Sequence, residues 1–234
     1  MANHFFQFKQ FRIQQQNCAM KVGTDSILLG AWVNVSQTTR ILDLGTGTGL
    51  LALMLAQRTA QAQIIGVEID PLAAKQAQDN VANSPWAYRI RIVRSDIAQF
   101  AQQHRQRFDC IVANPPYFNQ GVDCRNDARN TARYLASQTH LDWLNIAYSC
   151  LTEQGHIHFV LPVEQGEWLK QHSPLPCVAQ CLIRSKQAKP PNRILLCFSP
   201  QAMPCEQTEL IIHQPDNQYT AEFKQRTQAF YLNF

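Results

Sequence analysis

From residue 40 onward, short apolar runs alternate with longer segments in which leucine and alanine recur at helical spacing. The runs RILDLG, QIIGVEID, RIRIVRSD, RFDCIVANPPYF and HIHFVLP indicate strands. TGLLALMLAQRTA and PLAAKQAQDNVANS, which lie between them, indicate amphipathic helices, the second with Asp70 as its cap and Pro71 in its first turn. Strands that alternate with helices predict right-handed crossovers and a mostly parallel sheet covered on both faces. The predicted fold class is therefore α/β.

The same alternation continues toward the C-terminus. LDWLNIAYSCLTEQG predicts an amphipathic helix that is ended by Gly155, and a further helix is expected around residues 163–172. CVAQCLIRS and RILLCFSP predict two strands joined by the loop KQAKPPN, which makes seven strands between residues 40 and 200. Beyond residue 200, CEQTELIIH predicts a strand, and FKQRTQAFYLNF a final helix whose aromatic residues belong to the core.

Residues 1–39 precede this pattern. FFQFKQFRIQ is compatible with a strand, and GTDSILLGAWV predicts a short helix with Thr24 or Asp25 as its cap. No repeat, low-complexity tract or linker divides the chain. We therefore expect a single domain over residues 1–234, in which residues 1–39 form an extension of a core at 40–234.

Composition narrows the class of protein further. With 45% hydrophobic and 16% charged residues, the chain is expected to be globular, and its net charge of +4 is compatible with a nucleic-acid partner. The N-terminus lacks the features of a signal peptide, and no window approaches the ~18 apolar residues of a membrane span, so we expect a cytoplasmic protein without a membrane partner. The eight cysteines form no CxxC pair, so we interpret them, Cys177 and Cys181 included, as thiols and expect no metal.

A glycine-rich turn follows the first predicted strand. LDLGTGTGLLALML places Gly45, Gly47 and Gly49 between that strand and the first helix, where glycine permits a positive φ and close approach of a ligand to the backbone. The spacing G-x-G-x-G differs from the dinucleotide fingerprint G-x-G-x-x-G, and no Walker lysine follows. Phosphate binding is therefore disfavoured, and a purely structural turn remains an alternative for the glycines taken alone.

Three acidic residues accompany this turn at the carboxyl ends of the first three strands. Asp43 precedes the glycines, Glu68 ends the second strand and Asp96 ends the third. Ligands of doubly wound sheets bind at this edge, where Glu68 would accept ribose hydroxyls. Asp43 would suit an ammonium group, and Asp96 an exocyclic adenine amino group.

Over nearly all of residues 40–200, the glycine turn and the acidic residues together resemble the class I methyltransferases that bind S-adenosyl-L-methionine. The resemblance implies a Rossmann-like fold with helices on both faces of the sheet. The residues that it implies for cofactor binding are Thr24, Asp43, Gly45, Gly47, Gly49, Glu68, Ile69, Asp96, Ile97 and Asn114.

The stretch CIVANPPYF ends the fourth predicted strand with two consecutive prolines. Proline has no N–H for the ladder, so strand pairing must stop after Ala113, and the residue before a proline is restricted to β or PPII geometry. The resulting corner directs the Asn114 side chain, the Pro115 carbonyl and the Tyr117 ring toward one small volume. Two acceptors there would hold both N–H bonds of an exocyclic amine, and Tyr117 would stack on an extruded base.

This corner resembles the NPPY motif of amino methyltransferases that act on adenine N6, cytosine N4 or glutamine N5. The resemblance implies that Asn114, Pro115, Pro116 and Tyr117 are the catalytic residues. The motif is specific for the reaction and leaves the substrate open. A proline turn that only ends an edge strand is the alternative.

Chain length and charge favour RNA as the substrate. DNA amino methyltransferases usually have an added recognition domain, and release-factor glutamine methyltransferases have a helical N-terminal domain for which residues 1–39 are too short. Two groups of basic residues lie on the expected path of RNA, one directly after the corner and one around the loop that follows the sixth strand. They are Arg125, Arg129 and Arg133 in the first group, and Arg184, Lys186, Lys189 and Arg193 in the second. A solvated charged face remains an alternative for each group.

Longer stretches sharpen the resemblance. FKQF, CAMKVGTDSILLGAW, VANPPYFNQGVDC and ARYL are similar to the bacterial tRNA(Val) adenine-N6 methyltransferases that modify adenosine 37, beside the anticodon. This resemblance implies a tRNA partner and S-adenosyl-L-methionine, and we expect a monomer. The alternatives are an N5-glutamine methyltransferase of a release factor or other protein, and a non-catalytic RNA-binding protein that retains the fold.

Overall fold

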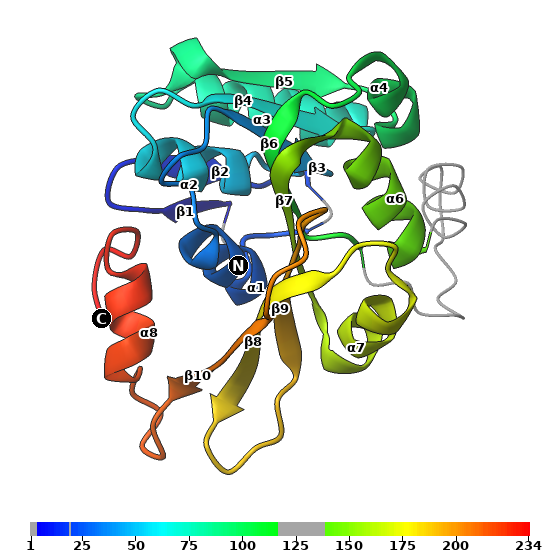
Figure 1. Ribbon diagram of the computed structural model, residues 1–234. Helices are drawn as coiled ribbons and strands as arrows, with labels where there is room; N and C mark the ends of the chain where they lie inside the picture. Colours follow the sequence, from blue (N-terminus) through cyan, green and yellow to red (C-terminus); the bar gives the residue numbers. More distant parts are fainter. Residues whose placement is uncertain (1–3, 19, 117–138) are drawn as a thin grey trace, which may run out of the picture.

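The computed structural model describes residues 4–18, 20–116 and 139–234, and it contains a central sheet of eight strands (Figure 1). The strands are, in spatial order, β10 (Glu206–His213), β8 (Cys177–Lys186), β9 (Arg193–Phe198), β7 (Leu151–Pro162), β6 (Phe108–Ala113), β3 (Arg40–Leu44), β4 (Gln63–Glu68) and β5 (Ile90–Arg94). All neighbours pair in parallel except β9, which is antiparallel to both β7 and β8. The predicted α/β class and mostly parallel sheet are confirmed. The seven strands expected before residue 200 are contiguous in the sheet, and β10 adds an eighth at its edge.

Helices cover both faces of this sheet. One face packs against α1 (Thr24–Trp32), α2 (Leu50–Arg58), α3 (Pro71–Ala82) and α8 (Ala221–Thr227). The other face packs against α4 (Ile97–Gln103), α6 (His140–Cys150) and α7 (Val163–His172). The short 3-10 helix η1 (Ala87–Arg89) precedes β5.

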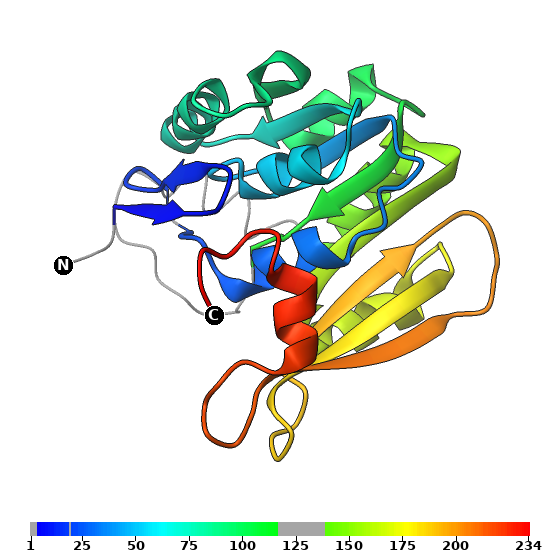
Figure 2. The same ribbon diagram turned by 90° about the vertical axis from the view of Figure 1, so that its left-hand side faces the viewer.

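The N-terminal stretch that was compatible with one strand forms a hairpin of two, β1 (Phe5–Gln7) and β2 (Arg12–Gln14). This hairpin lies beside the C-terminal segment (Figure 2), where the Lys9 N–H donates to the Phe230 carbonyl at 2.9 Å. Phe223 and Phe230 are 0% and 1% exposed, so the interpretation of the C-terminal aromatic residues as core is confirmed for these two.

The N-cap predicted from the sequence is correct for α3 and wrong for α1. Asp70 caps α3 as predicted, because its side chain accepts from the N–H groups of Leu72 and Ala73, and Pro71 occupies the first helical position. The prediction that Thr24 or Asp25 caps α1 is wrong. Gly23 is the N-cap, with an extended backbone and no side-chain cap, so both predicted residues belong to the first turn.

The predicted role of Gly155 as a helix end is also wrong. Helix α6 ends at Cys150, and Gly155 lies inside β7, where the register with β6 shifts between the pairs Phe108–Leu151 and Cys110–His156. An added Cβ at Gly155 would lie 2.6 Å from the Leu151 side chain. Gly155 therefore lies at a bulge and leaves room for the Leu151 side chain. Tertiary pairing creates this bulge, and helical periodicity does not reveal it.

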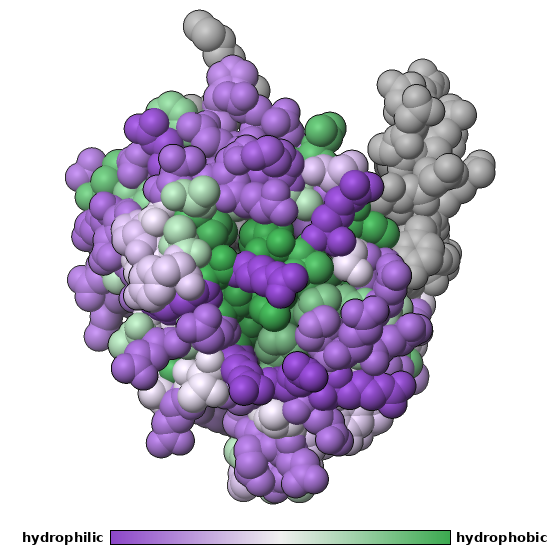
Figure 3. All heavy atoms as spheres, turned by 90° about the horizontal axis from the view of Figure 1, so that it is seen from above, coloured by the Kyte–Doolittle hydropathy of each residue, from purple (hydrophilic) through white to green (hydrophobic). Residues whose placement is uncertain are grey.

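The β5 end of the sheet is apolar at its centre and polar around it. Figure 3 views the molecule from the side where β5 lies and shows a group of hydrophobic residues with hydrophilic side chains around it and across its middle. In β5 itself, Ile92 and Val93 are partly buried, whereas Arg91 and Arg94 are exposed. Charged side chains on an edge strand disfavour its pairing with a second sheet.

The described cysteines are thiols, as the sequence predicts. Every cysteine in the described residues is free, and Cys181 is 1% exposed. The Sγ atoms of Cys177 and Cys205 lie 3.9 Å apart. Over residues 4–18, 20–116 and 139–234, no helix is long and apolar enough to cross a membrane, and no group of three or more His, Cys, Asp or Glu side chains is arranged to hold a metal ion.

Asn80, on the inner side of α3, joins the N-terminal hairpin to the glycine turn. Its Nδ2 donates to the carbonyls of Gln14 and Thr48, both at 2.9 Å, and its Oδ1 accepts from the Gln14 N–H at 2.9 Å. The side chain is 3% exposed. Backbone groups of two distant segments therefore depend on one buried amide.

We expect Asn80→Ala to lower the free energy of unfolding by about 3 kcal/mol, because it leaves buried backbone groups without partners. Asn83→Ala, at the exposed end of the same helix, should cost less than about 1 kcal/mol. Urea denaturation of both variants measures the difference. Equal losses would show that the Asn80 contacts contribute nothing beyond helix propensity.

Candidate active site at the carboxyl edge of the sheet

The glycine turn joins β3 to α2 in the left-handed conformation that the sequence predicts. Gly45, Gly47 and Gly49 have φ values of 67°, 55° and 82°. An added Cβ at Gly45 would lie 2.8 Å from the Trp143 ring, whereas one at Gly47 would meet no described atom within 4 Å. Gly45 is therefore required by packing, and Gly47 presents open backbone to a ligand.

Glu68, at the end of β4, is held beside this turn by backbone donors. Its Oε2 accepts from the Gly47 N–H and its Oε1 from the Asp70 N–H, both at 2.9 Å. Burial raises the pKa of Glu68, although these hydrogen bonds oppose the shift. Each oxygen retains a second lone pair, so the carboxylate is preoriented to accept the two ribose hydroxyls expected from the sequence.

Asp43 lies beneath the turn and is 0% exposed. Its Oδ2 accepts from the Thr46 hydroxyl at 2.5 Å and from the Ala52 N–H at 3.2 Å, while Oδ1 has no partner among the described residues. Burial raises the pKa of Asp43 to about 7, with the charge of Glu68 adding to the effect and the hydrogen bonds opposing it. An ammonium group would supply the partner that Oδ1 lacks.

The remaining predicted cofactor residues lie at the starts of helices or next to strand ends. Asp96 caps α4, where its Oδ1 accepts from the Gln99 N–H at 2.9 Å, and Ile97 is the first, buried residue of that helix. Ile69 directly follows Glu68 and is partly buried, and Thr24 is the first residue of α1. Asp96 therefore supports local structure in addition to the adenine contact that the sequence suggests.

The proline corner follows β6, which ends at Ala113 as predicted. Asn114 Nδ2 donates to the Ser26 hydroxyl at 2.9 Å, and Asn114 Oδ1 is buried with no partner among the described residues. The corner therefore presents one unused acceptor, which is the atom that an amine substrate needs. Tyr117 lies outside the described residues.

Two residues at the corner were not found from the sequence. Ser26 lies in the first turn of α1, and His140 is the first residue of α6, with its Nε2 3.3 Å from the Pro116 carbonyl oxygen. Burial lowers the pKa of His140, so a neutral ring donates to that carbonyl. Ser26 lies within CAMKVGTDSILLGAW, a stretch that carries the family resemblance, but nothing in that stretch marks this residue as a partner of the corner. His140 belongs to no motif, and both residues meet the corner only through the fold.

Some of the basic residues predicted to bind RNA already form ion pairs or hydrogen bonds within the protein. The β8–β9 loop leaves the sheet at the same edge as the corner, as expected, and Lys189 within it is exposed. Arg193 Nε forms an ion pair with Asp25 Oδ2 at 2.7 Å, and Lys186 Nζ donates to the Pro215 carbonyl at 3.2 Å. Arg125, Arg129 and Arg133 lie outside the described residues. Contact of either group with RNA stays a prediction.

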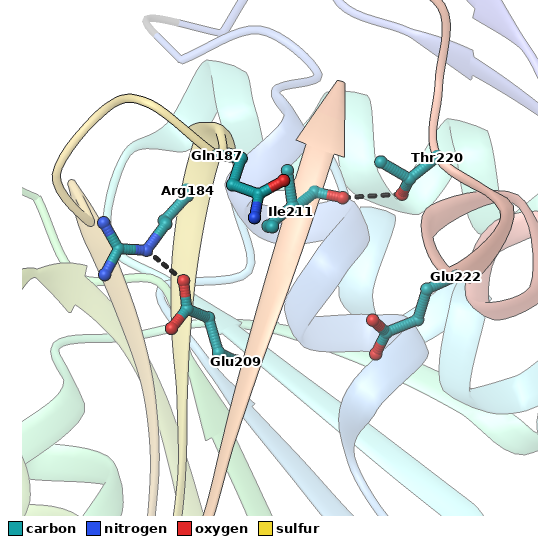
Figure 4. Close-up of a pocket in the computed structure, with 6 residues that line it drawn as sticks. All are labelled: Arg184, Gln187, Glu209, Ile211, Thr220 and Glu222. Carbon is teal, nitrogen blue, oxygen red and sulfur yellow. Dashed lines mark hydrogen bonds and ion pairs between the residues drawn. The ribbon is translucent and has the colours of Figure 1, made fainter. Parts of the chain in front are cut away.

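Arg184 belongs to a pocket on the outer side of this region. It pairs with Glu209 across β8 and β10, and Thr220 Oγ1 donates to the Ile211 carbonyl at 2.6 Å on the same pocket wall (Figure 4). The pocket has a volume of about 520 Å³ and is lined by Arg184, Gln187, Glu209, Ile211, Thr220 and Glu222. Because its guanidinium is already paired, Arg184 is a weaker candidate for a phosphate contact than Lys189.

Comparison with known proteins decides the family. The model of the methyltransferase small domain matches residues 17–166. A tRNA1(Val) (adenine(37)-N6)-methyltransferase from Actinobacillus succinogenes is 58% identical, with 100% of this chain and 99% of the relative covered. One from Haemophilus influenzae is 53% identical, with 98% of this chain and 99% of the relative covered. The chain belongs to this methyltransferase family.

Solved structures show the same fold at much lower identity. A predicted O-methyltransferase from Agrobacterium tumefaciens superimposes with a TM-score of 0.70 at 18% identity, covering 88% of this chain and 96% of that one. TYW2 from P. horikoshii, in complex with MeSAdo, has a TM-score of 0.57 at 14% identity, covering 84% and 71%. The class I methyltransferase fold predicted for the chain is confirmed.

The residues of this methyltransferase fit the cofactor of its fold class. Open backbone at Gly47 leaves room at the glycine turn, and the Glu68 carboxylate is oriented beside it. Asp43 Oδ1 is a buried acceptor that no described residue satisfies, so a donor group of a ligand could bind it. The three positions together match a ligand with an ammonium group and a ribose.

The raised pKa of Asp43 makes stability depend on pH. The folded state holds this proton up to about pH 7, whereas an unfolded aspartate loses it near pH 4. The stabilising effect of protonation is therefore complete below about pH 4 and is lost as the pH rises through 7.

We expect wild-type stability to fall relative to Asp43→Asn by at most about 1.4 kcal/mol per pH unit between pH 5 and 7, and then to level off. Urea denaturation of the ligand-free proteins at several pH values measures this difference. A difference that stays constant with pH would mean that Asp43 is ionised throughout.

Proposed function

We propose that this protein transfers a methyl group from S-adenosyl-L-methionine to the exocyclic N6 of adenosine 37 in the anticodon loop of tRNA(Val). The observation that supports the chemistry best is the buried Oδ1 of Asn114 at the proline corner, which has no partner among the described residues. The substrate follows from the names of the relatives, which cover almost the whole chain at more than half identity. We also propose that the chain acts as a single-domain monomer in the cytoplasm, where tRNA is found.

Residues of the glycine turn and the neighbouring strand ends would hold the cofactor. Glu68 would accept the ribose hydroxyls, Asp43 the ammonium, and Asp96 with Ile97 would contact the adenine. Bound S-adenosyl-L-methionine supplies a methyl group that its sulfonium already activates. The protein therefore needs neither a nucleophilic cysteine nor a metal, and orientation can provide most of the rate enhancement.

The corner acts on the amine. The lone pair of adenine N6 is delocalised into the ring, which makes it a poor nucleophile. Asn114 Oδ1 and the Pro115 carbonyl would accept hydrogen bonds from its two N–H groups and hold these groups out of the plane of the ring. The lone pair would then be less delocalised, which makes the nitrogen more basic. The contact between His140 and the Pro116 carbonyl supports the backbone of this corner.

A loop nucleotide suits this site better than a base in a duplex. An exocyclic amine can be reached only after its base leaves the stack, and this costs less in a single-stranded anticodon loop. Lys189 is exposed on the loop that leaves the same sheet edge, so it would meet the phosphate backbone of a docked tRNA.

Asn114→Ala should lower kcat by at least ~100-fold, by analogy with removing one preorganised polar contact from other active sites. Cofactor affinity, measured by calorimetry, should change little, because the lost acceptor serves the substrate amine. Asn83→Ala is the matched control, since that amide lies at the exposed end of α3. Near-normal turnover of Asn114→Ala would refute the proposed role of the corner.

Purified protein should methylate tRNA(Val) that lacks the modification, and nucleoside digestion should yield N6-methyladenosine. A transcript with guanosine at position 37 should accept no methyl group, and this result would show that adenosine 37 is the nucleotide that is methylated. Release factor and duplex DNA, assayed in parallel, should be poor acceptors. Methylation of glutamine in a protein, with none in tRNA, would agree with the proposed chemistry of the corner but would refute tRNA as the substrate.

A further inference from the structure

We propose that Ser26 is a positioning residue for methyl transfer, because it holds the amide of Asn114 with Oδ1 toward the substrate amine. The two residues are 88 positions apart in the sequence, and Asn114 Nδ2 donates to Ser26 Oγ at 2.9 Å. The inference rests on the proposed function, since it concerns the same corner. It assigns a role in the reaction to the N-terminal extension.

The amide of asparagine needs such a partner. Its terminal torsion is broad, so the two ends of the group exchange places easily unless one of them is held. One end is only a donor and the other only an acceptor. If Nδ2 faced the substrate, its N–H donors would face the N–H donors of the substrate amine, and no hydrogen bond could form between them. Nδ2 is satisfied by Ser26, and Oδ1 is buried with no partner in the part of the chain that the structure describes, so Oδ1 is the end that remains for the amine.

Ser26 is itself fixed by the packing of α1. The next three residues of the helix, Ile27, Leu28 and Leu29, are 1%, 2% and 0% exposed. Arg58, at the end of α2, donates from Nη1 to the Gly30 carbonyl at 2.7 Å. On the other side, the ion pair between Arg193 and Asp25 fixes the first turn of α1 to the start of β9. The hydroxyl of Ser26 therefore has a defined position, as a group that orients a catalytic side chain requires.

Single-turnover methylation of tRNA(Val) tests the role of the hydroxyl. Ser26→Ala should lower the rate of the chemical step by about 10- to 100-fold with the KM values for tRNA and cofactor within about threefold, because the contact acts on the reacting geometry. Ser26→Thr retains a hydroxyl and should restore the rate to within about threefold. Ser36→Ala, in the exposed loop after α1, should behave like wild type. Full activity of Ser26→Ala would overturn the proposal.

A double-mutant cycle shows whether Ser26 acts through Asn114. In the Asn114→Ala background, Ser26→Ala should lower the rate by less than about twofold further, since the group that it positions is already absent. The same fold-loss in both backgrounds would mean that Ser26 acts on something else, and the proposal would fail.

A measurement without substrate separates this inference from the proposed function. The side-chain amide signals of Asn114, assigned by their absence in Asn114→Ala, should exchange with solvent at least about tenfold faster in Ser26→Ala than in Ser26→Thr. If exchange responds in this way but wild type methylates no tRNA, the positioning contact stands and the substrate is wrong. If tRNA is methylated and exchange does not respond, the substrate stands and the positioning role of Ser26 is refuted.

Discussion

Parallel pairing of β3 with β4 and β6 is the constraint on which the candidate site depends. Leu44 lies opposite Val67 on one side and Ala113 on the other, so the three strands end at one level. The glycine turn, Glu68 and the proline corner follow directly from these ends. The glycine turn and the proline corner are therefore neighbours because of backbone hydrogen bonding, before any side chain contributes.

Burial at this edge of the sheet changes the pKa and the hydrogen bonding of its polar groups. Burial raises the pKa of Asp43 to about 7. Asp43 Oδ1, Asn114 Oδ1 and Trp143 Nε1 are all buried without a partner among the described residues, and Trp143 packs against Gly45. Unsatisfied polar atoms are costly in a core, so three of them beside the glycine turn and the proline corner leave hydrogen-bonding capacity that a ligand could use.

The N-terminal extension belongs to this site in structure as well as in sequence. Asn80 connects the hairpin to the glycine turn, and Ser26 of α1 contacts the catalytic corner. The ion pair of Arg193 with Asp25 then joins α1 to β9. A segment that the hydrophobic pattern separates from the core thus contributes contacts to both the glycine turn and the proline corner.

Local chemistry alone determined the strand end at Ala113, the left-handed glycine turn and the Asp70 cap, because each follows from the backbone limits of proline and glycine or from a side chain two residues away. Only the tertiary structure decided the bulge at Gly155, the pairing of β10 with β8 at the sheet edge and the contact of Ser26 with Asn114. These depend on strand pairing and packing between residues far apart in the chain, and no local periodicity encodes such distances.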